Sequence, residues 1–294
     1  MILSNDLLEI KNSFFAKNST ASEDCFLGFL VWQEKYKFEK VNLQKAFAIR
    51  LENKSSYWFP FADSEEDAVN AIYELMADKN LCFERVTQEQ KVFLETHFKD
   101  LFSFEDDRGN YDYLYDIDSL CTLSGRKLSK KRNHINGFLQ SYGDWNVQEI
   151  NSLNIQDVLE FAGQWYQKKS GGDSEIGDES LAYEKKALLQ IVPQIEKIGA
   201  DGIVLYVDGK VAAFTVGMKK KETVYDTVFE KADDGIKGSY NIINREFARF
   251  LKNKYESLKF INREQDLNLP GLRQAKLSYM PCSLVEKFVA KLIY

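Results

Sequence analysis

The stretch IVLYVDGKVAAFTVGMKKKETVYDTVF, residues 203–229, reads as three consecutive β-strands joined by two tight turns. Its first two strands, 203–207 and 211–217, are runs of apolar and β-branched residues, as buried strands require. Asp208-Gly209 between them is the two-residue signal of a β-hairpin. A lysine-rich turn then leads to the third strand, 223–229. The second half of the chain therefore carries an antiparallel meander.

Helices and one further strand flank this meander. Apolar residues at helical spacing predict two helices before it and one after it, the last beginning at Ser239 or Tyr240. The expected elements are helices at 154–169, at 178–198 with an interruption near Pro193, and at about 239–252, then a strand at 258–261 and a short helix. This order resembles that of a GNAT (acyl-CoA N-acyltransferase-like) domain, so we expect an α/β protein.

In the GNAT fold, the loop that enters the helix after the meander presents backbone N–H groups to the cofactor pyrophosphate. The residues in that place are Gly235, Ile236, Lys237, Gly238, Ser239, Tyr240 and Asn241. The usual loop reads (Arg/Gln)-x-x-Gly-x-(Gly/Ala), and neither Gly235 nor Gly238 fits that register. Asp233 and Asp234 would repel a pyrophosphate. The loop therefore favours a donor other than acetyl-coenzyme A.

The first hundred residues show a rougher version of the same order. Ser64 followed by Glu65, Glu66 and Asp67 has the form of a capping box and predicts a helix start. The expected elements are strands at 45–50 and 57–61, a helix from Ser64, a strand at 81–86 and a helix at 88–98. We therefore expect two GNAT-like halves, with domains 1–145 and 146–294.

Several segments have less decisive patterns. The apolar run 26–32 fits either a helix or a strand. Residues 104–110 are acidic and contain Gly109, so a loop is expected, while 111–116 alternates aromatic and polar residues as a strand does. Residues 285–293 read as a short amphipathic segment.

The bulk composition excludes several classes of protein. The chain has 294 residues and a formal net charge of −6, so bulk electrostatics argue against DNA as a partner. It has no run of about 18 apolar residues and no leader of the basic-then-apolar kind, which predicts a cytoplasmic protein without stable membrane insertion. Four well-separated cysteines and two histidines offer no zinc-ligand spacing, so no metal site is expected.

The charge is unevenly distributed along the chain. From Lys237 onward, eleven basic and five acidic residues give a net charge of +6, against −12 for the rest. Such a sector suits an anionic ligand, although ordinary fluctuation explains the imbalance equally well. The most basic local segment, 125–138, contains Arg126, Arg132 and Asn133. It is either a helix that faces an anion or a solvated helix that bridges two domains.

A second charged segment, NREQDLNLPGLRQAKLSYMP at 262–281, follows the expected strand at 258–261. Charges this dense at a strand end predict a polar site at the carboxyl edge of the sheet, where α/β folds bind ligands. The candidate residues are Asn262, Arg263, Glu264, Asp266, Arg273, Lys276 and Tyr279. The alternative is a solvated loop stitched together by salt bridges between its own acids and bases.

Three stretches resemble the bacterial family named for the carboxyl-terminal domain of phosphatidylglycerol lysyltransferase. Residues 125–136 are similar to its basic GK-x-x-x-x-x-RN-x-x-N segment. Residues 228–232 and 238–241 are similar to the EKA and GxYxxIN pattern of its stand-alone members, and 262–281 to their NREQDLG-x-PGLR-x-AK signature. The resemblance implies a GNAT-like fold and, by analogy with the lysyltransferases, transfer of an aminoacyl group from charged tRNA.

One departure from the lysyltransferase pattern bears on the substrate. Glu230 and Lys231 stand near the place where those enzymes have an acidic residue and an arginine. This difference argues against lysyl transfer to a lipid headgroup.

These observations together predict an acyl- or aminoacyltransferase. Such a transfer needs a base that deprotonates the nucleophile and an acid that protonates the leaving group. Glu230 is the candidate base, with a structural ion pair as the alternative, and Tyr279 is the candidate acid, with a packed aromatic as the alternative. Lys231, Arg263 or Arg273 would hold the phosphate or carboxylate of the donor.

The expected partner is a small-molecule or aminoacyl donor. A coenzyme A thioester and an aminoacyl-tRNA are the two donors considered, and the second makes tRNA a partner. The alternative function is a non-catalytic GNAT-like protein that binds an amino acid, a peptide or an aminoacyl-tRNA in the same place.

Overall fold

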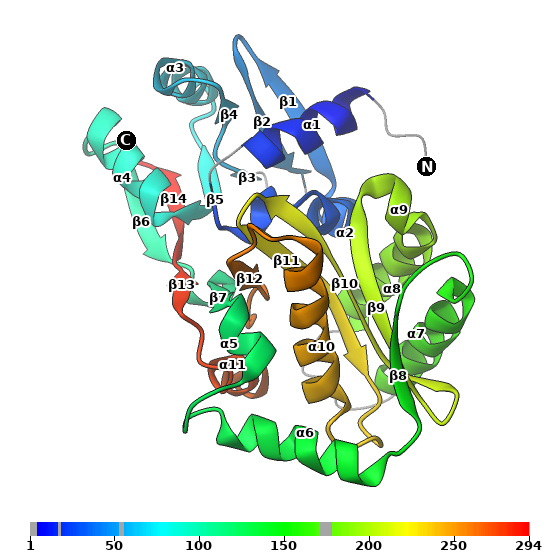
Figure 1. The fold of residues 1–294 in the computed structure, drawn as a ribbon. Helices are drawn as coiled ribbons and strands as arrows, with labels where there is room; N and C mark the ends of the chain where they lie inside the picture. The colour runs from blue at the N-terminus through cyan, green and yellow to red at the C-terminus, as the bar shows by residue number, and fades with distance from the viewer. Residues whose placement is uncertain (1–4, 17–18, 53–55, 171–177, 294) are drawn as a thin grey trace.

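A computed structural model describes residues 5–16, 19–52, 56–170 and 178–293, which form two seven-stranded sheets with helices packed around them (Figure 1). The first sheet, sheet A, has the strand order β1-β2-β3-β5-β14-β6, with β4 beside β2. Its strands are β1 (Phe38–Leu43), β2 (Ala46–Leu51), β3 (Ser56–Tyr57), β4 (Phe61–Ala62), β5 (Cys82–Thr87), β6 (Phe102–Asp106) and β14 (Lys287–Leu292).

The second sheet, sheet B, has the order β13-β7-β12-β11-β10-β9-β8. Its strands are β7 (Asp112–Asp116), β8 (Trp145–Glu149), β9 (Ala200–Val207), β10 (Lys210–Lys221), β11 (Val224–Ala232), β12 (Phe260–Asn262) and β13 (Ser283–Val285). The predicted meander is confirmed as β9, β10 and β11, which pair antiparallel. Asp208 and Gly209 both have positive φ, 50° and 73°, as a tight hairpin turn with right-handed strand twist requires.

Both halves repeat one order of elements. In the first half, the antiparallel strands β1, β2 and β3 are followed by helix α3 (Glu65–Leu75) and by β5, which is parallel to β3. In the second half, the meander is followed by helix α10 (Ser239–Lys254) and by β12, which is parallel to β11. The predicted cap of α3 is present, because the side chain of Ser64 accepts a hydrogen bond from the Asp67 amide.

The two halves exchange strands. β7 comes from the first half of the sequence but pairs with β12 and β13 in sheet B. β14 comes from the far end of the chain but lies inside sheet A, between β5 and β6. A division between residues 145 and 146 would cut the chain at the first residue of β8. Domains 1–145 and 146–294 therefore remain a prediction, and the sheets cross their boundary.

The structure decides two segments that the sequence left open, 26–32 and 285–293, and corrects the loop expected at 104–110. The run 26–32 belongs to helix α2 (Phe26–Tyr36). Residues 104–106 are not a loop but the end of β6, and 285–293 holds strand residues of β13 and β14. In both cases the strand is made by pairing with a distant segment, β6 with β14, which local sequence does not show.

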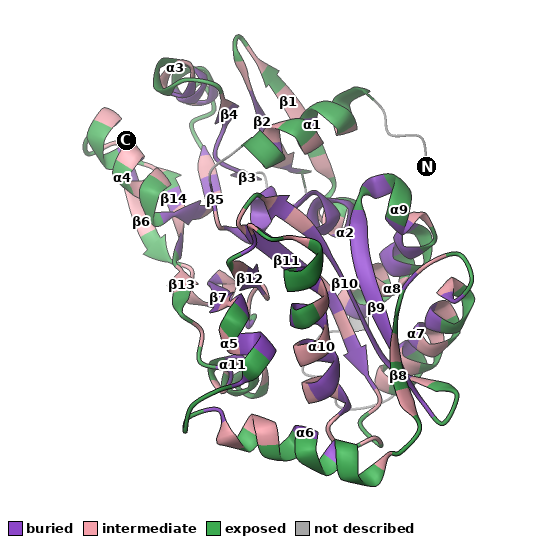
Figure 2. Ribbon diagram, in the orientation of Figure 1, coloured by how far each residue is buried: buried purple, intermediate pink, exposed green. Residues whose placement is uncertain are grey.

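Helices cover both faces of sheet B. One face carries α10 with the short helix α5 (Ile117–Thr122) and α6 (Ser129–Ser141). The other face carries α2 with α7 (Ile155–Lys169), α8 (Asp178–Ile191) and α9 (Ile195–Ile198). Buried residues accordingly run along β9, β10 and β11 (Figure 2). The remaining α-helices of the described residues are α1 (Asn5–Ala16), α4 (Gln88–His97) and α11 (Pro270–Leu277).

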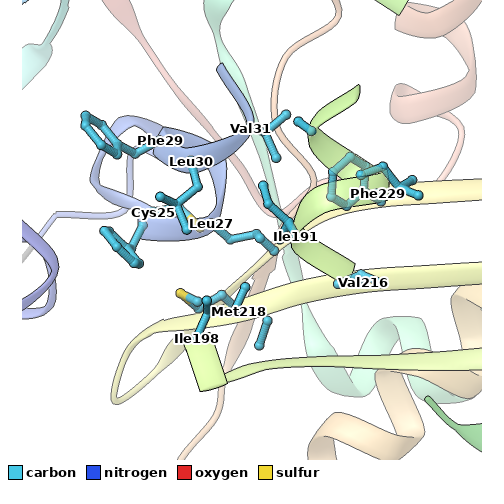
Figure 3. Packing of buried hydrophobic residues seen from close by; sticks show 14 of the residues in the cluster. Cys25, Leu27, Phe29, Leu30, Val31, Ile191, Ile198, Val216, Met218 and Phe229 are labelled. Atoms are coloured by element: carbon cyan, nitrogen blue, oxygen red, sulfur yellow. The ribbon is translucent and has the colours of Figure 1, made fainter. Parts of the chain in front are cut away.

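A shared apolar core joins the halves. Leu27 and Val31 of α2, from the first half, pack with Val216, Met218 and Phe229 of sheet B in one cluster (Figure 3). All five side chains are nearly inaccessible to solvent. Burial of this kind contributes about 25 cal/mol for each Å² of apolar surface, so the contact stabilises the arrangement of the two sheets.

A buried polar junction also ties sheet A to sheet B. The Nζ of Lys287, on β14, lies 2.8 Å from Asp112 Oδ1 on β7 and 2.7 Å from Glu23 Oε2. Asp112 further accepts hydrogen bonds from the Ser22 amide at 2.7 Å and from Asn262 Nδ2 at 3.2 Å. Lys287 and Asp112 are both fully buried, so each charge depends on the other for compensation.

Candidate functional site

The candidate site lies where β11 and β12 part. These parallel strands pair only from Val224 with Phe260 to Asp226 with Asn262. β12 ends there, whereas β11 continues to Ala232. Beyond the last pair the strands leave a wedge at their carboxyl ends, which we define by the side chains that fill it: Tyr115, Lys131, Glu230, Asn241, Asn244, Arg263, Lys276 and Tyr279. Ligands of open α/β sheets bind at this edge.

Glu230 and Arg263 face each other across the wedge. The Nη2 of Arg263 donates to Glu230 Oε1 at 2.7 Å, and both side chains are largely buried, with 14% and 13% of their surfaces exposed. Asn244, on α10, donates from Nδ2 to Glu230 Oε2 at 3.3 Å. The predicted base thus lies at the predicted edge, and the ion pair considered as its alternative is also present.

Tyr279 belongs to the same cluster and contacts both Asn241 and Arg263. Asn241 of α10 donates to its hydroxyl oxygen at 2.7 Å, which leaves the phenolic proton free for another acceptor. The guanidinium of Arg263 lies 5.0 Å from the ring centroid of Tyr279 and 5.6 Å from that of Tyr115. Burial raises the pKa of Tyr279 to about 12, so the hydroxyl is protonated at neutral pH.

Lys131 is a wedge residue that the sequence interpretation missed. Its Nζ lies 4.0 Å from the centroid of the Tyr279 ring, on the side of α6. Burial and the neighbouring charges of Arg263 and Lys130 lower the pKa of Lys131 to about 8. A signal was present, because Lys131 falls three residues after Leu128 and four before Ile135, on the buried stripe of its helix.

Lys276 and Glu264 complete the charged surroundings. The ammonium of Lys276 donates to the carbonyl oxygen of Arg263, and the Tyr115 hydroxyl donates to the carbonyl oxygen of Lys276 at 2.8 Å. Burial and the charge of Arg263 lower the pKa of Lys276. Burial raises the pKa of Glu264, whose backbone has a left-handed φ of 54°. Left-handed conformations cost energy in non-glycine residues and often occur at functional sites.

Asp266 and Arg273 form a latch within the 262–281 segment, as the salt-bridge alternative proposed. Arg273 donates to both carboxylate oxygens of Asp266, at 2.8 and 3.0 Å. Arg108 at 3.0 Å and the Tyr113 hydroxyl at 2.6 Å also donate to Asp266 Oδ2. The carboxylate is fully buried. This geometry gives the pair a role in holding the loop, and Lys276 bonds to backbone rather than to either acid.

We expect Asp266→Asn to lower the free energy of unfolding by roughly 2 kcal/mol at pH 7, because hydrogen bonds to a charged group are lost. Burial alone would raise the pKa of Asp266. Hydrogen bonds from Arg273 and Tyr113 outweigh it and hold this pKa well below its usual range. That stabilisation is complete above the ordinary pKa of about 3.9 and is lost as the pH falls through the folded value. Urea denaturation at pH 7 and pH 3 should therefore show a shrinking difference from wild type, and a difference independent of pH would contradict the assignment.

Lys231 does not join Glu230, although the two are adjacent in sequence. Successive side chains of a strand point to opposite faces, and Lys231 lies on the α7 and α8 face. Its Nζ lies 2.9 and 3.0 Å from the two carboxylate oxygens of Glu184 and 4.6 Å from the ring centroid of Trp165. Asn262 also lies outside the wedge. It belongs to the polar junction between the two sheets, where its Nδ2 donates to the Thr20 carbonyl oxygen at 2.9 Å.

The loop before α10 is closed by neighbouring groups. Gly238 has a φ of 88°, and a Cβ there would lie 2.8 Å from the carbonyl oxygen of His134 on α6. Ser239 donates to the Asp233 carbonyl oxygen at 2.9 Å, Lys237 is exposed, and burial raises the pKa of the half-buried Tyr240 to about 12. Helix α6 therefore lies against the place where a GNAT pyrophosphate would bind, and the residues present do not fit coenzyme A.

The other basic residues predicted from α6 lie around its start. Arg132 donates to the carbonyl oxygens of Leu123 and Gly125, so it holds the turn before the helix. Arg126 and Asn133 are exposed. Across the described residues, no three His, Cys, Asp or Glu side chains gather so that they could hold a metal ion. No helix in the same ranges combines the length and apolar character needed to cross a bilayer.

The sequence of the chain matches a known protein family over almost its whole length. The model of the family described as "Phosphatidylglycerol lysyltransferase, C-terminal" matches residues 15–291. The chain belongs to this family. A crystal structure of a conserved protein of unknown function from Bacteroides thetaiotaomicron is 31% identical, with a TM-score of 0.87 over 98% of this chain and 97% of that one.

Two more distant solved structures share the fold. A C-terminal domain (DUF2156) from Agrobacterium fabrum, assigned to a lysylphosphatidylglycerol synthetase, is 14% identical with a TM-score of 0.66, over 98% of this chain and 92% of that one. L-PGS from Bacillus licheniformis is 15% identical with a TM-score of 0.64, over 99% and 92%. The two GNAT-like α/β halves predicted from the sequence are thereby confirmed.

One further relative has no assigned activity. An uncharacterized protein of Mycoplasmoides gallisepticum is 23% identical over 184 residues, which is 62% of this chain. The match spans 56% of the length of that relative, so about half of it.

Proposed function

We propose that this chain is an acyl- or aminoacyltransferase whose active site is the wedge between β11 and β12. The observation that carries the proposal is the placement of Glu230 across from Arg263 with Tyr279 beside them, at the carboxyl ends of two parallel strands. Membership of the family supports the same class of reaction.

The wedge offers the groups that acyl transfer needs. An amine or hydroxyl of the acceptor attacks the carbonyl carbon of the donor ester while Glu230 takes its proton. A new C–N or C–O bond forms, the ester C–O bond breaks, and Tyr279 protonates the departing oxygen. The cations Arg263 and Lys276 favour the negative charge that develops on the carbonyl oxygen.

An aminoacyl ester of tRNA is the donor that we favour. Coenzyme A does not fit, because α6 lies against Gly238 at the start of α10, where a pyrophosphate would bind. Three basic residues with exposed side chains come shortly before the wedge residue Lys131 in the sequence: Arg126, Lys127 and Lys130. Basic side chains of this kind suit the phosphates of an RNA end.

A binding protein without catalysis is the second candidate. One observation favours it: the carboxylate of Glu230 is already held by Arg263 and by Asn244. In that case the wedge binds an amino acid, a peptide or an aminoacyl-tRNA and releases it unchanged.

Tyr279→Phe tests the proposal. The purified protein is incubated with a bulk tRNA pool charged with labelled amino acids and with a cell extract as acceptor, and labelled product is measured. We expect the turnover of Tyr279→Phe to fall about tenfold to a hundredfold because the acid is lost, with little change in donor KM. Wild-type protein that retains charged tRNA without forming product would instead indicate the binding protein, and an unchanged turnover would remove Tyr279 from the mechanism.

A further inference from the structure

We propose that Lys131 and Arg263 together bind one anionic group of the substrate, a carboxylate or a phosphate, over the face of Tyr279. The inference rests on the proposed function and names a chemical feature of its substrate. It also gives Lys131 a role as a binding residue.

The first observation is that two cations share one aromatic ring. Lys131 Nζ lies 4.0 Å, and the Arg263 guanidinium 5.0 Å, from the centroid of Tyr279. Each cation is attracted by the ring, but the two repel each other in a setting where water is largely excluded. The repulsion is a cost that an anion placed between them would remove.

The second observation is an unused donor. Arg263 uses Nη2 for Glu230, whereas its Nη1 is buried without a hydrogen-bond partner among the described residues. A buried donor left unpaired destabilises the folded protein, and the cost is larger when the donor is charged. The geometry therefore leaves one charge-assisted hydrogen bond for a ligand to make.

The third observation is an excess of positive charge. Among the described wedge residues, Lys131, Arg263 and Lys276 are cations, and Glu230 is the carboxylate that pairs with Arg263. Glu264 offsets little of this charge near neutral pH, since burial raises its pKa. Lys130 on α6 adds a further positive charge near Lys131. A bound anion would restore the balance.

A neighbouring acceptor narrows the ligand further. Asn244 is 5% exposed, bonds to the same carboxylate as Arg263, and has a buried Oδ1 without a partner in the described part of the chain. The anionic group of a ligand would accept a hydrogen bond from Arg263 Nη1, and a neighbouring N–H or O–H group of the same ligand would donate to Asn244 Oδ1.

Titration calorimetry with sulfate and with acetate tests the site without any need for turnover. Sulfate represents a phosphate and acetate a carboxylate, and the ion that binds more tightly identifies the source of the anion. We expect millimolar binding to wild-type protein at pH 7, and binding about tenfold weaker to Lys131→Met. Lys197→Met is the matched control, because it removes an exposed charge from α9, which lies on the other face of sheet B.

The pH dependence adds a second readout. The titratable and charged groups around Lys131 come from three elements. Tyr279 and Arg263 belong to the 262–281 segment, Glu230 belongs to β11, and Lys130 precedes Lys131 on α6. With its pKa near 8, Lys131 is charged at pH 7 and mostly neutral at pH 9, so wild-type affinity should fall over this range. The affinity of Lys131→Met should fall less, because Lys276, whose pKa is also lowered, is then the wedge lysine that still loses its charge. Absence of binding to the wild type, or equal binding to Lys131→Met, would overturn the inference. Anion binding without aminoacyl transfer would instead leave this site standing and remove the proposed function.

Discussion

Replacing Lys287 by methionine is expected to lower the free energy of unfolding by roughly 3 to 5 kcal/mol. Lys287 is fully buried and is the cation that joins Asp112 of sheet B to Glu23. Methionine fills a similar volume but leaves the carboxylate of Asp112 buried with hydrogen bonds from neutral groups only. Urea denaturation followed by circular dichroism would measure the loss.

Lys291→Met provides the matched control on the same strand. The side chain of Lys291 is 48% exposed and pairs with Glu105, which is 64% exposed. Exposed pairs of this kind contribute about 0–1 kcal/mol, so the control should unfold almost as the wild type does. If the two variants were destabilised equally, the polar junction would not have the importance that we assign to it.

Glu230→Gln is expected to reduce aminoacyl transfer by about a hundredfold or more, the contribution typical of a general base. Glutamine keeps the shape of the side chain and can still accept a hydrogen bond from Arg263, but it cannot take a proton. Turnover should therefore fall while the donor is still bound. The measurement is labelled product formed per enzyme under saturating donor, together with donor affinity.

Glu222→Gln is the control for this change. Glu222 lies in the turn between β10 and β11, where 67% of its side chain is exposed and it pairs with Lys219. We expect it to transfer at the wild-type rate. Wild-type turnover in Glu230→Gln would show that the base lies elsewhere, whereas loss of both turnover and binding would favour a purely structural ion pair with Arg263.

Local patterns predicted much of the second half. The hairpin signal at Asp208-Gly209 and the apolar runs beside it correctly predicted the meander, because adjacent antiparallel strands pair through short turns. The residues of β14, Lys287–Leu292, carried no comparable signal. Their strand depends on β5 and β6, and a lysine in sequence indicates the surface rather than a fully buried position.

The residues of the candidate site could be predicted one by one from their strand ends, but the contacts between them could not. Glu230 and Arg263 were both nominated from their strand ends, but their contact joins residues 33 positions apart and needed the fold. The separation of Lys231 from Glu230 follows from strand alternation, which the sequence interpretation did not apply. Asp266 was nominated for ligand binding, whereas the structure shows that Arg273, Arg108 and Tyr113 satisfy its carboxylate.

The exchange of β7 and β14 has a consequence for biosynthesis. A ribosome makes the first half before the second, at about 5–20 residues per second, and N-terminal segments usually begin to fold first. Here sheet A lacks an interior strand until residues 287–292 have left the ribosomal tunnel. During that interval the edges of β5 and β6 are unpaired and can associate with other nascent chains. Both sheets should therefore reach their final form late, only after residues 287–292 have been made and have paired with β5 and β6.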